Sequence, residues 1–207
     1  MTETRAVSLE EVKKLREMTG AGMMDCRKAL EDARGDLDKA VLLLRERGMA
    51  KAAKRVGRET SNGVVEAYLH RTSEDYPPQI GAMVEVNCES DFVAKGPDFR
   101  TLVRDLALHI AAAAPRWVSR EQVPADVVEQ EREVYRRKAD QEGKPAQVID
   151  KIVAGQIESF YKDNCLLDQA FVRDPATRVG DLIVQTAAKL QENITVRRFA
   201  RFSIKEA

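Results

Sequence analysis

The first fifty residues carry apolar side chains at the three- and four-residue spacing of amphipathic helices, interrupted at two places. Ser8, with an acidic residue three positions later, has the pattern of a capping box at the start of the first run. The turn-forming segments 19–22 and 35–36 separate the runs, and Gly48 follows the last one. Residues 1–50 are therefore predicted to form a module of three short helices, with Gly48 ending the third.

Residues 51–62 interleave lysines and arginines with alanines and polar residues. We interpret this stretch as a basic linker that is partly helical. A solvated linker is the simpler explanation of the charge, and an arm that binds phosphate groups is the alternative. The sequence leaves both interpretations open.

Alternation of apolar and polar residues replaces the helical period at residues 63–70 and again at 80–88, which predicts two strands. Pro77 and Pro78 lie between them and cannot continue a strand, so they belong to a loop. A third alternating run at 194–204 predicts a last strand. Because strands that are neighbours in sequence usually pair, we expect one antiparallel sheet of three strands.

Helical periodicity returns after the second strand. One apolar stripe runs from Phe99 to Ala114 and predicts a long amphipathic helix. Two further helical segments are joined at Gly143-Lys144-Pro145, which predicts an antiparallel helical hairpin over about residues 125–162. The segment 164–176 reads as a loop, and a last helix is expected from about 179 to 191.

These elements predict an α+β fold. The chain of 207 residues has room for one substantial domain and a small one. We expect the helical module in residues 1–50, the linker in 51–62 and an α+β core domain in 63–207, with the helical hairpin inserted in it.

Charge and hydropathy narrow the classes of function. Lysine plus arginine equals aspartate plus glutamate, 34 of each, so the formal net charge is zero. Nucleic-acid binding generally relies on an excess of cations that displaces the counterions of the phosphates, so no direct binding of nucleic acid is expected. No run approaches the ~20 apolar residues that span a bilayer, and no membrane association is expected.

Cysteine and histidine usage excludes further chemistry. Cys26, Cys88 and Cys165 include no CxxC pair, which does not suit a metal site. Their odd number, with no apolar leader sequence, predicts a cytoplasmic protein. Neither His70 nor His109 lies beside a plausible nucleophile, and the glycine-rich loops that hold nucleotide phosphates are missing. We therefore predict no catalytic residues, no cofactor, no metal and no enzyme activity.

The segment Ser90-Asp91-Phe92-Val93 lies between the second strand and the long helix. A phenylalanine beside an aspartate at such a corner fits neither a core pattern nor a plain turn. It has the character of an apolar side chain directed at a partner, with a charge next to it. In the alternative, Phe92 closes the local core and Asp91 caps the next helix. That helix is expected to start several residues later, at Pro97, which weakens the alternative.

A second unusual segment joins the first two helices and contains the adjacent methionines Met23 and Met24. Two adjacent side chains cannot both face one small core, so one of them is expected at the surface. There the flexible thioether suits an adaptable interface. Ordinary core packing is the alternative. Cys26 lies on the apolar stripe and is expected to be structural.

Three segments together resemble the bacterial elongation factor Ts family: Thr19–Cys26, Ser90–Val93 and Leu108–Pro115. The similarity runs from about Val7 to the last strand. It implies that the N-terminal module is similar to a ubiquitin-associated domain. It also implies that the protein is a guanine-nucleotide exchange factor whose partner is the GTPase elongation factor Tu.

The resemblance also implies roles for individual residues. Leu15, Met23 and Met24 would contact the GTPase domain of elongation factor Tu, and so would His109, which borders the apolar stripe of its helix. The segment Ser90–Val93 would enter a gap between two helices of the GTPase and dislocate its magnesium ion. The family usually has threonine where this chain has a serine at the first of these positions, and either hydroxyl can bond the local backbone.

One departure from the longer members of the family matters. They carry a second sheet-bearing subdomain before the His-Ile-Ala-Ala helix, whereas here Phe99 leads almost directly to His109. The chain therefore looks like the short form, for which the resemblance implies a homodimer. Phe92 and His109 acting on one GTPase would then come from different subunits, and Cys165 is a candidate to face its counterpart.

Two other classes of function are kept as alternatives. One is a helical adaptor whose N-terminal module binds a ubiquitin-like or peptide partner. The other is a redox enzyme that uses Cys88, which lies three residues before Asp91. A normal thiol pKa, or undiminished activity of a Cys88→Ser protein, would count against the second.

Overall fold

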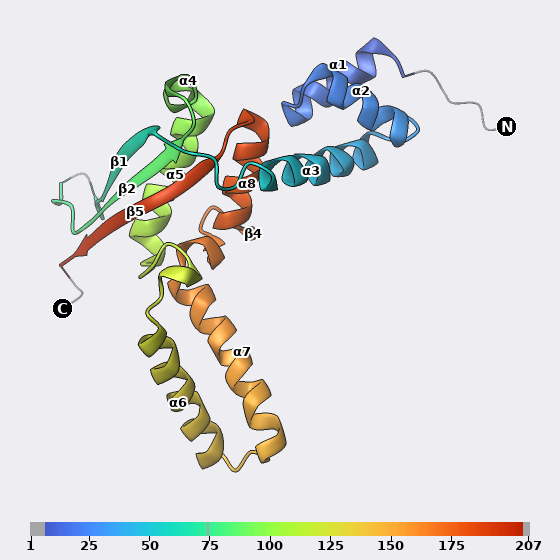
Figure 1. Ribbon diagram of the computed structural model, residues 1–207. Helices are drawn as coiled ribbons and strands as arrows, with labels where there is room; N and C mark the ends of the chain where they lie inside the picture. The colour runs from blue at the N-terminus through green and yellow to red at the C-terminus, as the bar shows by residue number, and fades with distance from the viewer. Residues whose placement is uncertain (1–6, 74, 205–207) are drawn as a thin grey trace.

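The computed structural model describes residues 7–73 and 75–204, and Figure 1 shows their arrangement. Its helices are α1 (Leu9–Thr19), α2 (Met23–Asp32), α3 (Leu37–Ala53), α4 (Asp91–Lys95), α5 (Pro97–Ala113), α6 (Ala125–Gln141), α7 (Ala146–Asn164) and α8 (Val179–Leu190). The strands are β1 (Asn62–His70), β2 (Ile80–Cys88), β3 (Ala170–Phe171), β4 (Asp174–Arg178) and β5 (Ile194–Ser203). Single turns of 3-10 helix occur at η1 (Arg120–Gln122) and η2 (Leu166–Asp168). The α+β fold class is confirmed.

Helices α1, α2 and α3 enclose an apolar core of their own. The predicted capping box is present, because Ser8 Oγ accepts from the N–H of Glu11 and the Glu11 carboxylate accepts from the N–H of Ser8. Gly20 follows α1 with a φ of 66°, in the left-handed region that glycine adopts without strain. Buried side chains come from all three helices: Val12, Leu15, Cys26, Ala29, Leu30, Ala33, Ala40 and Leu44.

The end of α3 differs from the prediction. Gly48 lies inside the helix, which continues to Ala53, so part of the expected linker is helical. Ala52 is buried among the residues that pack beneath the sheet, whereas Leu44 belongs to the N-terminal core. A glycine costs a helix only about 1 kcal/mol relative to alanine, and packing at both ends of α3 offsets this. One helix therefore contributes to two cores.

Strands β1, β2 and β5 form the predicted antiparallel sheet, with β2 in the centre. Met83 of β2 lies between Ala67 of β1 and Ala200 of β5. Successive side chains of a strand point to opposite faces, so Val84 and Val86 are buried while Met83 is exposed. Helix α5 packs against the buried face (Figure 1).

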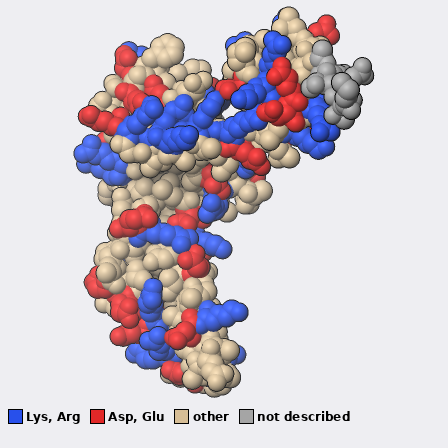
Figure 2. Space-filling view, turned by 45° about the vertical axis from the view of Figure 1, so that its right-hand side comes forward, with Lys and Arg blue, Asp and Glu red and all other residues tan. Residues whose placement is uncertain are grey.

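Helices α6 and α7 form the predicted antiparallel hairpin, which extends away from the sheet (Figure 1). Gly143 makes the turn with a φ of 67°. Arg136 and Asp150 pair across the two helices at 3.2 Å, and Figure 2 shows charges of both signs along this limb of the molecule. Within the described part of the chain, no helix is long and apolar enough to cross a membrane.

Two short structures are absent from the prediction. The segment 164–176, expected to be a loop, contains η2, β3 and most of β4, and the two strands pair with each other. Helix α4 follows β2 almost immediately, before the expected helix start at Pro97. Neither structure is long enough to display a hydrophobic period.

Candidate functional site

The segment Ser90–Val93 forms the start of α4, at the junction between the sheet and α5. Ser90 is the N-cap residue, and its Oγ accepts a hydrogen bond of 3.3 Å from the backbone N–H of Val93. Asp91 lies in the first turn, where the partial positive charge of a helix N-terminus favours a carboxylate. The expectation that the nearest helix begins at Pro97 is therefore wrong, and Asp91 does lie at a helix start.

Helix α4 directs Phe92 into solvent. Its exposed fraction is 82%, whereas the neighbouring Val93 and Ala94 are buried against the core. The alternative in which Phe92 closes the local core is wrong for this reason. The two buried residues hold the inner side of the short helix against the core. The backbone that carries the aromatic ring is therefore fixed.

The charge beside the ring is held by an ion pair. Lys95 Nζ donates to the Asp91 carboxylate at 2.7 Å, across one turn of α4. This hydrogen bond and the positive charge of Lys95 lower the pKa of Asp91. Asp91 therefore carries its negative charge throughout the neutral pH range.

Glu192, in the turn between α8 and β5, ties the junction in place. Its Oε2 accepts hydrogen bonds of 3.0 Å from the backbone N–H groups of both Glu89 and Ser90, and its Oε1 accepts from Ser90 Oγ. In return the Glu89 carboxylate accepts from the N–H of Asn193 at 2.6 Å. Sequence reasoning missed Glu192, since a single glutamate a hundred residues from its partners leaves no local pattern.

Cys88, the last residue of β2, does not suit redox chemistry. The thiol is fully buried and donates to the carbonyl oxygen of Ser90 at 3.2 Å. Burial, with a contribution from the negative charge of Glu192, raises the pKa of Cys88 to about 11. The thiolate, which is the nucleophilic form, is therefore scarce at neutral pH, and the redox alternative loses its support.

Met23 and Met24 are the first two residues of α2, and one of them is exposed, as predicted. Met24 is 75% exposed, whereas Met23 is partly buried and packs against the core of the three N-terminal helices. Leu15 is fully buried in that core. Of the three residues, Met24 is thus the one that presents an exposed apolar side chain, whereas the other two belong to the core of the N-terminal helices. Cys26 is buried, as predicted.

His109 lies inside the core and does not border it, which corrects the prediction. The imidazole is fully buried: its Nδ1 accepts from the N–H of Val172 at 3.3 Å, and its Nε2 lies 2.9 Å from Gln169 Oε1. Since Nδ1 is an acceptor, the proton of the neutral ring is on Nε2 and is donated to Gln169. Gln169 in turn donates to the carbonyl oxygens of Ala113 and Asp163. His109 therefore holds the β3–β4 hairpin against α5.

The burial of His109 predicts a contribution to acid unfolding. Loss of hydration lowers the pKa of His109 in the folded protein. An unfolded chain binds a proton at this position below about pH 6.5, and the folded one does not, so unfolding takes up a proton and acid favours it. Between pH 7.5 and 5.5 the free energy of unfolding should fall more steeply in the wild type than in His109→Asn, by about 1 kcal/mol. Urea unfolding at several pH values checks this.

His70→Asn, a substitution of the exposed histidine at the end of β1, is measured alongside as the comparison variant. Equal slopes for the wild type and His109→Asn would contradict the assignment of a buried neutral imidazole.

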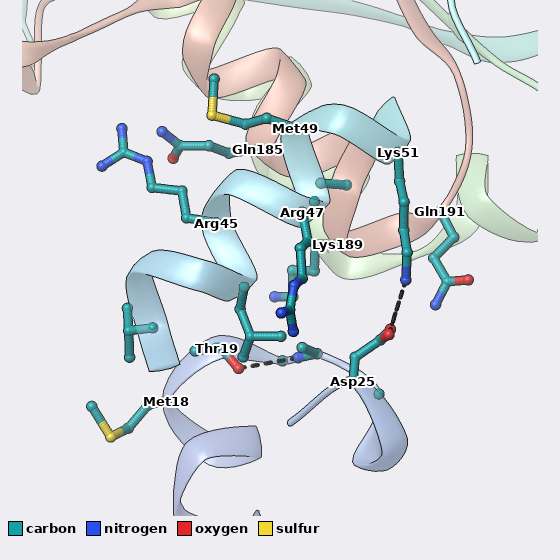
Figure 3. Close-up of a pocket in the computed structure, with 17 residues that line it drawn as sticks. Met18, Thr19, Asp25, Arg45, Arg47, Met49, Lys51, Gln185, Lys189 and Gln191 are labelled. Carbon is teal, nitrogen blue, oxygen red and sulfur yellow. Dashed lines mark hydrogen bonds and ion pairs between the residues drawn. The ribbon is translucent and has the colours of Figure 1, made fainter. Parts of the chain in front are cut away.

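The candidate residues do not line one cavity. Phe92 precedes α5 and His109 lies in its last part, twelve positions after Pro97, so about 18 Å of helix separates the two. Met24 belongs to the N-terminal helices, which Figure 1 shows apart from α4. A hollow of about 310 Å³ lies between the α1–α2 turn, α3 and α8, and none of these three residues lines it (Figure 3). Phe92 and Met24 are therefore exposed at separate places on the surface, and His109 lies in the core.

The basic stretch after Gly48 is partly neutralised. Lys51 Nζ donates to both carboxylate oxygens of Asp25, at 2.9 and 3.0 Å, and Arg58 pairs with Glu89 at 3.5 Å. Figure 2 shows a band of lysines and arginines across the upper part of the molecule. These ion pairs give two of the cations a structural role, and the phosphate-binding interpretation gains no support from them.

Comparison with known proteins identifies the family. The family model described as Elongation factor TS matches residues 3–206. The chain is 53% identical over 200 residues to Elongation factor Ts of Fervidobacterium nodosum, covering 97% of this chain and 99% of that protein. It is 54% identical over 196 residues to Elongation factor Ts of Caldanaerobacter subterraneus subsp. tengcongensis, covering 95% and 96%. Since the match spans almost every residue on which the fold is built, the chain belongs to the elongation factor Ts family.

Proposed function

We propose that this protein releases GDP from elongation factor Tu by inserting Phe92 next to the magnesium site of that GTPase. As a member of its family the chain is a guanine-nucleotide exchange factor for elongation factor Tu and performs no covalent catalysis. The family does not specify which atoms do the work. One observation supports this assignment, the exposure of Phe92 on a helix whose other side is anchored in the core.

An isolated exposed apolar residue is ordinary on a protein surface, so exposure alone carries little weight. Phe92 differs because its backbone is fixed on three sides. Ser90 caps the helix, Val93 and Ala94 are buried, and Glu192 holds the preceding amides. A rigid aromatic side chain loses little conformational entropy when a partner covers it, and such residues dominate binding energy at interfaces.

The proposed mechanism is mechanical. Magnesium bridges the phosphates of the nucleotide and oxygen atoms of the GTPase, and it neutralises charge between them. Insertion of Phe92 between helices of the GTPase shifts the groups that hold the ion, while the Asp91 carboxylate adds a negative charge nearby. Both changes weaken the binding of GDP. The nucleotide-free GTPase, still bound to the factor, then binds GTP and dissociates from it.

Thermodynamic linkage sets the size of this effect. The exchange protein lowers the affinity of elongation factor Tu for GDP by some factor, and GDP lowers its affinity for the exchange protein by the same factor. A thousandfold weakening of GDP corresponds to about 4 kcal/mol. One phenylalanine does not supply all of it, so a second contact is needed. We assign that contact to Met24, supported by Met23 and Leu15, and give His109 the role of positioning the β3–β4 hairpin.

Stopped-flow measurement of GDP release tests the function directly. Elongation factor Tu loaded with a fluorescent GDP analogue is mixed with this protein and an excess of unlabelled nucleotide. The release rate should rise with protein concentration and saturate, and excess magnesium should oppose the rise. A release rate that does not depend on the protein would refute the proposal.

We further propose that the protein is a homodimer that pairs the outer faces of two sheets. The face opposite α5 carries the exposed apolar residues Val65, Leu69, Met83, Phe202 and Ile204. The first four lie in neighbouring rows of the three strands, with Leu69 and Phe202 flanking Gly81 and Met83 lying between two alanines. Two sheets that pack face to face bury such side chains between them.

Placing a charge at the centre of this face is expected to separate the subunits. Met83 is 53% exposed, so Met83→Asp should leave the chain folded while burying a carboxylate in the dimer interface. Sedimentation equilibrium should show the mass falling from that of two chains to the 23.2 kDa of one. Leu42→Asp, on the exposed side of α3, is the matched control and should leave the mass unchanged. A wild-type protein that is monomeric at all concentrations would contradict the proposal.

A further inference from the structure

Helix α3 connects the two bodies of the protein without a break. Its first half packs with α1 and α2 through Ala40 and Leu44, and its last turn packs with the main core through Ala52. Figure 1 shows the helix spanning the space between the N-terminal helices and the sheet. The orientation of the N-terminal helices therefore depends on how α3 is seated against the core.

Helix α3 packs against the main core where it crosses α8 at close range. At Gly48, in the interior of α3, an added Cβ atom would lie 3.1 Å from the Cβ of Ala188 on α8. Such a separation is tighter than ordinary contact between carbon atoms, so the backbone of α3 approaches α8 as closely as a glycine allows. The same glycine makes the helix less stable than an alanine would. Close packing gives a physical reason for a residue that otherwise weakens the helix.

Two lysines near the crossing form ion pairs with neighbouring helices, and Figure 3 shows both side chains. Lys51 of α3 reaches Asp25 of α2 at 2.9 Å. Lys189 of α8 passes beside Gly20, where an added Cβ would lie 3.1 Å from its Cε, and its Nζ pairs with Asp98 of α5 at 2.8 Å. Exposed ion pairs of this kind contribute little each, so the helix crossing is the stronger constraint.

We propose that Gly48 and Ala188 form a joint that fixes the distance between Met24 and Phe92, which makes Gly48 a positioning residue for nucleotide exchange. The inference rests on the function proposed above, in which these two side chains contact one GTPase. Two contacts held at a fixed separation bind together, because binding of one places the other at a high effective concentration. If α3 were loosely packed against α8, part of this advantage would be lost, since the orientation of the N-terminal helices would have to be fixed on binding.

The joint is tested with Gly48→Leu, which inserts a side chain where α3 and α8 meet. Gly155→Leu is the matched control, because Gly155 is also inside a helix but an added Cβ has no neighbour within 4 Å. Spin labels on Lys28→Cys and Arg100→Cys, which are exposed on α2 and α5, report the distance between the two bodies. The native cysteines are buried. We expect a shifted and broadened distance distribution for Gly48→Leu and an unchanged one for Gly155→Leu.

The exchange assay supplies a second readout. For Gly48→Leu, the protein concentration that gives half-maximal GDP release should rise roughly 10-fold, whereas the maximal rate should stay within about twofold because Phe92 is intact. Adding Ala188→Gly should restore part of the distance and part of the affinity. Thermal unfolding of each variant shows whether the chain is folded.

The possible outcomes separate the two proposals. An unchanged distance in Gly48→Leu overturns the joint. A changed distance with an unchanged half-maximal concentration overturns the positioning role of Gly48. Undiminished exchange by Phe92→Ala overturns the proposed function, while the distance measurement still decides whether the joint exists.

Discussion

Phe92→Ala is expected to slow GDP release from elongation factor Tu by roughly 30- to 1000-fold, the range for removal of a dominant aromatic contact of about 2–4 kcal/mol. The physical reason is that the variant keeps the rest of the surface but loses the aromatic side chain of α4. The complex should still form, because Met24 and the rest of the surface are intact. Stopped-flow release of a fluorescent GDP analogue, with a separate titration of binding, measures both quantities.

The fold should not change in Phe92→Ala. The side chain is 82% exposed and lies outside the apolar clusters of the structure, so we expect the free energy of unfolding to stay within about 0.5 kcal/mol of the wild type. Urea unfolding checks this. The result separates a functional defect from a structural one. A variant that releases GDP slowly but unfolds like the wild type has lost only its contact with the GTPase.

Two further variants sharpen the test. Phe92→Leu keeps an apolar side chain without the flat ring, and its rate should lie between those of the wild type and the alanine variant. Val56→Ala removes a comparably exposed apolar residue from another surface and should leave exchange unaffected. Full activity of Phe92→Ala would show that another residue disturbs the magnesium site.

The long elements of this fold are predictable because their periodicity extends over many residues. Alternation at 80–88 and the apolar stripe of α5 each specify which face is buried, and the structure agrees in both. The hairpin of α6 and α7 follows from its turn at Gly143-Lys144-Pro145. In these cases local pattern and tertiary packing require the same residues to face inward.

The predictions are wrong where tertiary contacts, and not the local sequence pattern, determine the structure. Gly48 reads as a helix end from its neighbours, yet α3 continues because both of its ends are packed. Its role depends on Ala188, 140 positions along the chain, which no local pattern reveals. Similarly, His109 is buried because Val172 and Gln169 satisfy both ring nitrogens, and these partners come from another part of the sequence.

Part of the candidate site could be predicted from the sequence. The unusual composition at Phe92 and at the paired methionines indicated exposed side chains, and the structure places Phe92 and Met24 in solvent. What the sequence could not supply is the support beneath them. Glu192 is the clearest example, since an acidic residue after a helix is common and its three hydrogen bonds to the junction depend on the fold.

Glu192→Ala is expected to lower the free energy of unfolding by about 2–4 kcal/mol. The substitution leaves the N–H groups of Glu89 and Ser90, both partly buried, without their acceptor, and an unsatisfied buried donor costs about 1–3 kcal/mol. The two losses share one partner and are not additive. For a chain of this length the change corresponds to a fall of roughly 5–15 °C in Tm, which calorimetry measures. Glu142→Ala, at the exposed tip of the hairpin, should change Tm little.

The same variant connects stability to exchange. Without Glu192 the corner that carries α4 loses three of the hydrogen bonds that hold it, so the direction of Phe92 is less firmly fixed. At a temperature where the variant is folded, we expect GDP release to slow roughly 10-fold, because the orientation of the ring must be fixed on binding. Glu192→Gln keeps an oxygen that accepts from both N–H groups and should lie between alanine and the wild type in both measurements. If Glu192→Ala were as stable as the wild type, the carboxylate would not be anchoring the junction, and the support assigned to Phe92 would have to come from elsewhere.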